Sequence, residues 1–323
     1  MQKLLPVLAA LPLSASAFAD VKVYQNDSLP LTGGGVVACQ AGFIANEIGA
    51  ASFDVPPSDG KILILEAQWW ACDGSGIGFA QPRPMQVQVY PAGGPNPGAP
   101  VYVSPDVTAT PGFLNLFPIA DQNLTFDGGD TFTVGIQLQP SGLFQQFTTL
   151  ATDADGCQPG KSLIFAIPGG WADACSFGVS GDMFVRARVL TEGPTTYGAG
   201  TPGTGGQVPA IDSAGPWFIG GAFEVTCSNA ATGTPGFLGI STAPSALPLF
   251  GGTVLIDPTA VGATFVPTVS SGAGTASLPT PIPGGNPGLI GARVYFQYGF
   301  LDGGAAGGVS MSAGLDVKIS NNT

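Results

Sequence analysis

Eight polar and aromatic side chains in the first 190 residues have the chemistry of a sugar-binding surface. Flat aromatic rings stack on sugar rings, and amides, a carboxylate and guanidinium groups form directional hydrogen bonds. In three segments these side chains occupy the polar positions of an alternating pattern, so we expect them to share one outward sheet face. They are Glu66, Gln68, Trp70, Gln86, Gln88, Tyr90, Arg186 and Arg188. The alternative is a solvated face, or one on which the loop 71–84 covers Trp70.

Two aspartates offer oxygen ligands of the kind that Ca²⁺ takes. Asp153 and Asp155 stand at i and i+2 before Gly156 in the segment TDADG. Cys157 occupies the place where an EF-hand would have its third oxygen ligand, and Asp-Gly pairs are also common in plain turns. Calcium is therefore the one cofactor that the sequence suggests, and a plain turn is the alternative.

Two glycine-rich segments look like nucleotide-binding motifs but lack the structure that such motifs need. Residues 198–203 read G-x-G-x-x-G, but the sequence after them has no helical period. Without a helix N-terminus nothing there would hold a pyrophosphate. The segment DGCQPGKS has Asp155 where a P-loop has its first glycine, and a carboxylate there would oppose a phosphate. We interpret the first segment as a flexible linker and the second as a turn tied by a disulfide.

The chain contains no histidine. This excludes catalytic triads built on histidine and metal sites with histidine ligands. A pair of carboxylates could still hydrolyse a glycosidic bond. The four glutamates stand in no recognisable constellation, so a carboxylate-dependent glycoside hydrolase is the last of our three hypotheses.

Five cysteines are distributed unevenly along the chain. Four of them precede the glycine-rich segment 198–203, and Cys227 follows it alone. Four cysteines allow three pairings, and we favour Cys157–Cys175 and Cys39–Cys72 because each closes a loop of moderate length. Disulfides of this kind are typical of exported proteins. We expect Cys227 to be a buried thiol.

The first 19 residues have the features of a secretory signal peptide. Lys3 provides the positive charge, an apolar run follows, and Ala17-Phe18-Ala19 forms an A-x-A cleavage site. The apolar run is too short to span a bilayer, and no later run reaches the length of about 18 residues that a span needs. We therefore expect a protein that is secreted, extracellular or periplasmic, cleaved near Ala19 and without a membrane span.

The composition limits the partners and the fold class. The net charge of −12 argues against binding to nucleic acid or to anionic membranes, which depends on Lys and Arg. Extracellular glycans or envelope proteins are the partners that remain. Fifty glycines and 30 prolines, together with 44% hydrophobic residues, favour all-β domains with long loops.

Strict alternation of apolar and polar residues predicts half-buried antiparallel strands in four segments of the first domain. These segments are 61–72, 85–90, 130–139 and 183–190. In the first of them, the alternation places Leu63, Leu65 and Trp69 inside and Trp70 outside. The same pattern returns after residue 206 with fewer charges.

The predicted architecture is all-β, with two β-sandwich domains joined by a Gly/Pro/Thr-rich linker. After the signal peptide at 1–19, we expect a jelly-roll-like sandwich at 20–190. The linker follows at 191–206, and a second sandwich occupies 207–323.

Two stretches resemble a secreted C-terminal domain that is appended to many exported proteins of environmental bacteria. They are YGAGTPGTGGQVPAIDSAGP at 197–216 and ASLPTPIPGGNPGLIGARVYFQYGFLD at 276–302. The end of the first domain, from DADGCQPGKS to VRARV, is similar to a recurring module of such proteins. The resemblance implies secretion and β architecture, and it implies no activity and no functional residue.

Together these observations favour a secreted, non-enzymatic protein with a structural, adhesive or accessory role at the cell envelope or outside the cell. The alternative is a carbohydrate-binding protein that uses the outer sheet face of the first domain. The exposure of Trp70 would separate these two hypotheses.

Overall fold

The computed structural model describes residues 21–30, 37–40 and 42–321. The chain divides into an N-terminal unit, Val21–Thr191, and a C-terminal unit that begins at Glu192. The expected signal peptide and its cleavage site lie outside the described residues. In the described part of the chain, no helix is long and apolar enough to cross a membrane.

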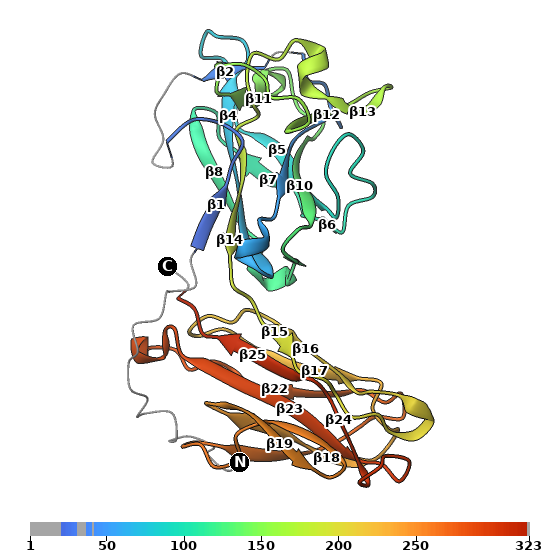
Figure 1. The fold of residues 1–323 in the computed structure, drawn as a ribbon. Coiled ribbons are helices and arrows are strands. Elements are labelled where there is room, and N and C mark those ends of the chain that lie inside the picture. Colours follow the sequence, from blue (N-terminus) through green and yellow to red (C-terminus); the bar gives the residue numbers. More distant parts are fainter. Residues whose placement is uncertain (1–20, 31–36, 41, 322–323) are drawn as a thin grey trace. The chain divides into compact units, whose positions relative to one another are not determined.

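The N-terminal unit is a sandwich of two antiparallel sheets, which we name the β4 sheet and the β5 sheet (Figure 1). The β4 sheet contains, in order, β1 (Val21–Tyr24), β14 (Val185–Leu190), β4 (Ile62–Asp73), β11 (Thr148–Thr152) and β2 (Ala38–Cys39), with β8 (Phe113–Pro118) and β9 (Thr125–Phe126) paired to β4. The β5 sheet contains β13 (Gly170–Asp173), β12 (Ser162–Ala166), β3 (Ile48–Asp54), β10 (Thr131–Leu138), β5 (Arg83–Tyr90) and β6 (Tyr102–Val103), with β7 (Val107–Ala109) paired to β5. Short 3-10 helices interrupt the connections at η1 (Pro57–Asp59), η2 (Ala120–Gln122), η3 (Gln145–Phe147) and η4 (Ala174–Phe177).

The alternating segments form strands, as predicted, and their apolar sides meet in one core. Alternate side chains of β5, β10 and β14 pack between the two sheets because successive residues of a strand point to opposite faces. The contributors are Met85, Val87, Val89, Phe132, Val134, Ile136, Leu138, Val185, Ala187 and Val189. The all-β sandwich prediction is confirmed.

Strand β4 differs from the predicted alternation in its first half. Ile62 and Ile64 belong to the core cluster, followed by Ala67 and Trp69, so the inward face changes register after Ile64. The pairing with β14 shifts at the same place, between Arg188 and Val189. A β-bulge of this kind adds one residue to a strand and reverses the faces beyond it. The prediction that Leu63 and Leu65 share the face of Trp69 is therefore wrong, although Trp69 is buried as expected.

Both predicted disulfides are present. Cys39 of β2 is bonded to Cys72 of β4, and Cys157 is bonded to Cys175 of η4. Cys227 is free and buried, as expected, and burial raises the pKa of its thiol to about 12.

The C-terminal unit is also all-β. Its largest sheet has the order β15 (Thr195–Tyr197), β25 (Gly314–Lys318), β23 (Arg293–Leu301), β18 (Pro235–Ser241) and β21 (Thr264–Val269), with β24 (Val309–Met311) paired to β23. A smaller sheet contains β16 (Ala210–Ala214), β17 (Glu224–Ser228) and β22 (Ala276–Pro279), and a hairpin contains β19 (Pro244–Leu249) and β20 (Gly252–Ile256). The 3-10 helices η5 (Thr204–Gly206) and η6 (Pro287–Leu289) complete the unit.

The glycine-rich segment is part of the C-terminal unit, and this corrects the expectation of a linker at 191–206. Strand β15 pairs with β25, and Thr201 forms a β-bridge with Met311. The glycines permit close packing: a Cβ atom at Gly203 would lie 1.9 Å from a carboxylate oxygen of Asp302. The backbone amide of Thr204 donates to that same oxygen at 2.9 Å. The G-x-G-x-x-G spacing therefore reflects contact with a neighbouring strand and its turn.

Candidate functional site

The eight residues predicted to share one outward face lie on two different sheets. Glu66, Gln68 and Trp70 are on β4, and the two arginines of β14 are on the same sheet. Gln86, Gln88 and Tyr90 are on β5, in the other sheet of the sandwich. The loop 74–82 carries the chain from one sheet to the other, so consecutive strands in the sequence are not neighbours in the fold. The prediction of a single eight-residue face is therefore wrong.

The outer face of the β5 sheet is occupied by its own side chains. Gln88 is 6% exposed and Tyr90 is 2% exposed. The Tyr90 hydroxyl donates to Gln88 Oε1, and Gln88 Nε2 donates to Gln137 Oε1 at 2.9 Å. Gln86 is half-buried, and its amide donates to Asp106 at 3.0 Å. These polar groups satisfy one another.

Two aromatic side chains of the β12–β13 hairpin cover this face. The Trp171 ring meets the Tyr90 ring edge-on at 5.2 Å and the Phe165 ring at 5.5 Å. Burial under this cover raises the pKa of Tyr90. Gln88 and Tyr90 are thus held under a lid of the protein's own residues, and a ligand would have to displace that lid.

On the β4 sheet, Arg186 is also unavailable to a ligand. It is fully buried, and its Nε donates to Asp27 Oδ2 at 2.9 Å while Nη2 donates to the other oxygen of Asp27. Nη2 also donates to the Leu29 carbonyl at 2.8 Å. The guanidinium lies 4.0 Å from the centre of the Phe184 ring, which is a cation–π contact. Arg186 therefore fixes the segment that follows β1.

Three predicted residues remain half-buried on the outer face of β4, and we name Glu66, Gln68 and Trp70 the β4 strip. The Gln68 amide donates to Glu66 Oε1 at 2.8 Å, which orients both side chains. The Trp70 ring stacks on the Phe184 ring with 5.9 Å between centroids and 10° between planes. The strip combines one aromatic face with a carboxylate and an amide. Together with Gln86 and Arg188, which are also half-buried, it is the part of the predicted face that the structure leaves partly accessible.

The neighbours of the β4 strip come from β14 and β8. Arg188 pairs with Glu66 in register, so the last of the predicted residues borders the strip. On the other side, Leu114 pairs with Trp70 and Leu116 pairs with Gln68, and Leu116 is 53% exposed. Sequence reasoning missed this apolar border. Leu114 and Leu116 stand two residues apart in FLNLFP and so share one strand face, and this spacing was the signal that could have found the border.

The predicted calcium ligands lie in a loop that is held together by hydrogen bonds. Asp153 is 4% exposed, and its two carboxylate oxygens accept backbone N–H groups of Ser28 at 2.9 Å and Asp182 at 2.8 Å. Asp155 is exposed, and a hydrogen bond from the Ser28 side chain lowers the pKa of its carboxyl. These hydrogen bonds explain why Asp153 is buried, because its carboxylate holds two backbone segments in place. Calcium binding by the pair stays a prediction.

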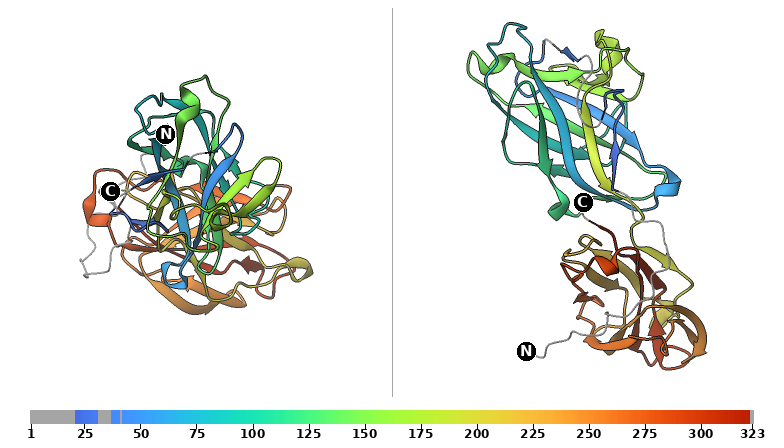
Figure 2. Two further views of the ribbon diagram at one scale, coloured as in Figure 1. Left: turned by 90° about the horizontal axis from the view of Figure 1, so that it is seen from above. Right: turned by 90° about the vertical axis from the view of Figure 1, so that its left-hand side faces the viewer.

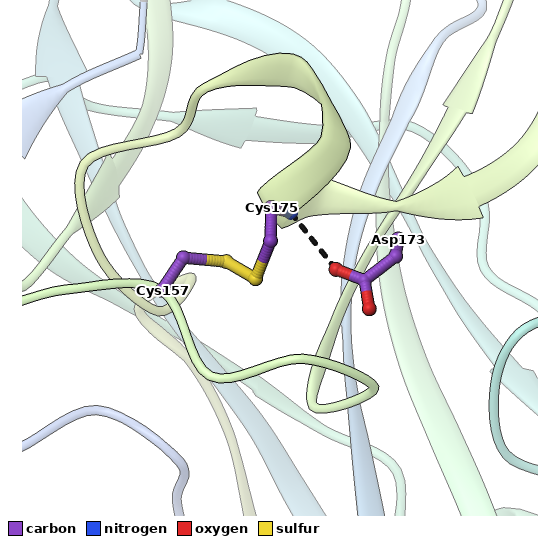
Figure 3. Close-up of side chains that lie close together, drawn as sticks. All are labelled: Cys157, Asp173 and Cys175. Carbon is purple, nitrogen blue, oxygen red and sulfur yellow. Dashed lines mark hydrogen bonds between the residues drawn. A yellow bond between two sulfur atoms is a disulfide. The ribbon is translucent and has the colours of Figure 1, made fainter.

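Among the described residues, one group of three thiol or carboxylate side chains lies close enough together to share a metal ion. It consists of Cys157, Asp173 and Cys175 (Figure 3). The two sulfur atoms are bonded to each other, so they do not offer the thiolates that metals prefer. Asp173 accepts the backbone N–H groups of Cys175 at 2.8 Å and Gly160 at 2.6 Å. The hydrogen bonds of Asp173 therefore reinforce the connection that the disulfide makes between the two loops.

The glutamates considered for hydrolysis each have a local partner. Glu47 accepts the backbone N–H groups of Ile44 and Ile167, at 2.8 and 3.0 Å. In the C-terminal unit, Glu192 pairs with Lys318, and Glu224 accepts a hydrogen bond from Ser277.

No known protein-family profile matches the chain, and no curated protein matches it. Among solved structures, it is similar to a GH2 β-galacturonidase from Eisenbergiella tayi bound to galacturonate, with a TM-score of 0.17 and 10% identity over 83% of this chain and 35% of that one. It is also similar to a β-glucuronidase from Ruminococcus gnavus, with a TM-score of 0.19 and 9% identity over 83% of this chain and 36% of that one. The chain spans about a third of the length of these enzymes. Similarity at this level carries no information about its own activity.

Proposed function

We propose that this chain is an exported, non-catalytic protein with a structural, adhesive or accessory role at the cell envelope or outside the cell. Two disulfides within one unit support export, because such bonds persist in oxidising compartments.

The observation that carries the structural part of the proposal is the use of buried charge. Asp27 and Arg186 pair with each other and hold the backbone at Leu29. Asp59, 3% exposed, accepts the Lys22 ammonium and the Tyr24 hydroxyl, each at 2.7 Å, and so anchors β1 to η1. Burial opposes ionisation of Asp59, but these hydrogen bonds outweigh it and lower its pKa. Such groups stabilise loops and strand ends, as a durable extracellular scaffold requires.

The test is to locate and weigh the protein made by producing cells. We expect the protein in the envelope fraction or the medium. Its mass should be that of a chain that begins at Asp20. After denaturation without reductant, alkylation should modify one cysteine, Cys227. A cytoplasmic protein that keeps residues 1–19, or one with four or five alkylated cysteines, would contradict the proposal.

A second candidate function, carbohydrate binding, is favoured by the β4 strip. The Trp70 indole could stack on a sugar ring while Glu66 and Gln68 form hydrogen bonds to its hydroxyl groups. Such binding would give an adhesive protein its target.

A glycan array probed with the mature chain tests this second candidate. We expect Trp70→Ala to weaken binding about tenfold, which corresponds to ~1.4 kcal/mol. Gln68→Ala should also weaken it. Gln86→Ala is the matched control, a half-buried glutamine on the other sheet, and it should bind like the wild type. If no polysaccharide binds, or if Gln86→Ala has the larger effect, this second candidate is wrong and the scaffold proposal stands.

A further inference from the structure

Four large apolar side chains project into solvent at one end of the N-terminal unit. Ile77 is 70% exposed, Leu143 68%, Phe144 53% and Phe79 52%. The rings of Phe79 and Phe144 lie 6.2 Å apart, and Ile77 and Leu143 stand two residues and one residue before them in the same two loops. We name these four residues the apolar tip. It lies where β4 ends and β11 begins, because Asp73 and Thr148 pair there (upper end of the unit in Figure 1).

The first loop of the apolar tip has a defined conformation. The Asp73 carboxylate accepts the backbone amide of Ser75 at 2.8 Å and its hydroxyl at 2.5 Å, and the Ser75 hydroxyl oxygen accepts the amide of Ile77. Gly76 and Gly78 have φ angles of +69° and +79°, which glycine adopts without strain. Ile77 therefore stands at the apex of a tight turn built to present it.

A buried arginine ties the two loops of the apolar tip together. Arg83 is 2% exposed, and its guanidinium donates to the carbonyl of Gln139 at 2.9 and 3.1 Å and to that of Thr148 at 3.2 Å. The loops also bond directly, since the amide of Gly74 donates to Phe147 at 2.7 Å and that of Gln81 donates to Phe144 at 3.3 Å. The apolar side chains are thus displayed on a braced double loop, at the cost of leaving them in water.

The charge of the apolar tip indicates which surface it fits. The loop segments 74–82 and 139–147 contain no charged residue, although the chain as a whole carries −12. An acidic protein with an uncharged apolar tip has no attraction to anionic headgroups, and the hydrophobic effect is its main driving force for insertion.

The size of the apolar tip argues against a second copy of the chain as its partner. Four side chains, about half to 70% exposed, present a few hundred Å² in total. Specific protein–protein interfaces bury roughly 1,200 Å² or more over both partners, or about 600 Å² on each, which the four side chains alone do not reach. A fluid lipid layer has no such requirement, because its hydrocarbon closes around each inserted side chain.

We propose that the apolar tip inserts into the surface of a lipid layer with uncharged or zwitterionic headgroups, and so holds the N-terminal unit against it. Ile77, Phe79, Leu143 and Phe144 enter the interface. Asp73 and Arg83 position the loops without touching lipid. This is a peripheral attachment and it adds to the roles proposed above.

Co-sedimentation of the mature chain with phosphatidylcholine vesicles tests this proposal. We expect binding by the wild type and a loss of at least about tenfold in Phe79→Ser/Leu143→Ser, because a buried side chain of this size contributes roughly a decade of affinity. The matched control is Leu301→Ser/Val261→Ser, which removes two side chains of 57% and 77% exposure in the C-terminal unit. It should bind like the wild type. Replacing a third of the lipid with phosphatidylglycerol should weaken binding, since the chain is acidic.

A second measurement is independent of the folding of the double variant. The four natural tryptophans lie outside the apolar tip, so the fluorescence added by Phe79→Trp reports on the tip alone. Brominated phosphatidylcholine should quench it. Absent quenching, binding that the serine substitutions leave unchanged, or stronger binding to anionic vesicles would overturn the proposal. So would a dimer in lipid-free size-exclusion chromatography that Phe79→Ser/Leu143→Ser abolishes, because the partner would then be a second copy.

Discussion

The two outer faces of the N-terminal sandwich have similar sequences but different surroundings. In both strands polar residues alternate with apolar ones and an aromatic residue follows in the same alternation: Glu66, Gln68 and Trp70 in β4, and Gln86, Gln88 and Tyr90 in β5. On the β5 face, the Tyr90 ring packs against Trp171, and its hydroxyl donates to the buried Gln88 side chain. On the β4 face, the side chains of the strip (Glu66, Gln68 and Trp70) are half-buried, so part of each meets solvent.

The difference teaches that alternation predicts which side chains point outward and leaves open what covers them. The cover on the β5 face comes from a hairpin about 80 residues further along the chain, at β12 and β13. On the β4 face, the segment after β1 holds Arg186 through the Leu29 carbonyl, and the Leu29 side chain belongs to the same apolar cluster as Trp70. The right-hand view of Figure 2 shows β4 and β14 side by side, although many residues separate them in the sequence.

The largest expected effect comes from breaking the buried ion pair between Asp27 and Arg186, which lies beside the β4 strip. Arg186→Met should lower the free energy of unfolding by ~3–5 kcal/mol, because it leaves the Asp27 carboxylate buried without its cation. Urea denaturation followed by tryptophan fluorescence measures this. Adding Asp27→Leu should recover much of the loss. A cost below ~1 kcal/mol for the single variant would mean that the pair is exposed to water.

Removing the cover of the β5 face should have a smaller effect. Trp171→Ala should lower the free energy of unfolding by ~2 kcal/mol. This is less than the loss from truncating a fully buried tryptophan, since Trp171 is only half-buried. It should also open Gln88 and Tyr90 to solvent, and thus make the two faces alike. Thermal unfolding and amide hydrogen exchange along β5 check the two parts. Unchanged exchange in β5 would show that Trp171 is not the cover.

The smallest effect is expected from the single hydroxyl beneath that cover. Tyr90→Phe should cost ~1 kcal/mol near neutral pH, because the hydrogen bond to Gln88 is lost. Burial raises the pKa of Tyr90, so the folded state favours the neutral phenol. The stabilisation by the phenol is therefore complete below pH ~10, the value for an unfolded tyrosine, and is lost as the pH rises further. Between pH 8 and 12, the free energy of unfolding should fall less steeply with rising pH for Tyr90→Phe than for the wild type.

Much of the fold could be predicted from the sequence because its causes are local. The period-two pattern of 85–90 and 183–190 follows from strand geometry, and both disulfide pairings followed from loop length. The bulge in β4 could not be predicted, because it depends on pairing with β14. The glycines of 198–203 suggested flexibility, but their reason is the close approach of Met311 and Asp302, which no local pattern reveals.

The candidate site could be predicted only in part, because its other determinants are not local. Membership of one sheet depends on how strands are connected across the sandwich, and the loop 74–82 sends β4 and β5 to opposite sheets. The side chains of Glu66, Gln68 and Trp70 lie on an outer face, as the alternation predicts, and ligand binding by them stays a prediction. The burial of Arg186 depends on Asp27, which stands 159 positions away.

The central claim is that the half-buried β4 strip meets solvent while Gln88 and Tyr90 of the β5 face do not, and radical footprinting of the native protein tests it most directly. Hydroxyl radicals oxidise aromatic side chains that meet solvent, and mass spectrometry of peptides locates the products. We predict that Trp70 is oxidised several times faster than Tyr90, and that Trp171→Ala accelerates the oxidation of Tyr90 and leaves Trp70 unchanged. Oxidation of Tyr90 as fast as that of Trp70 in the wild type would contradict the account.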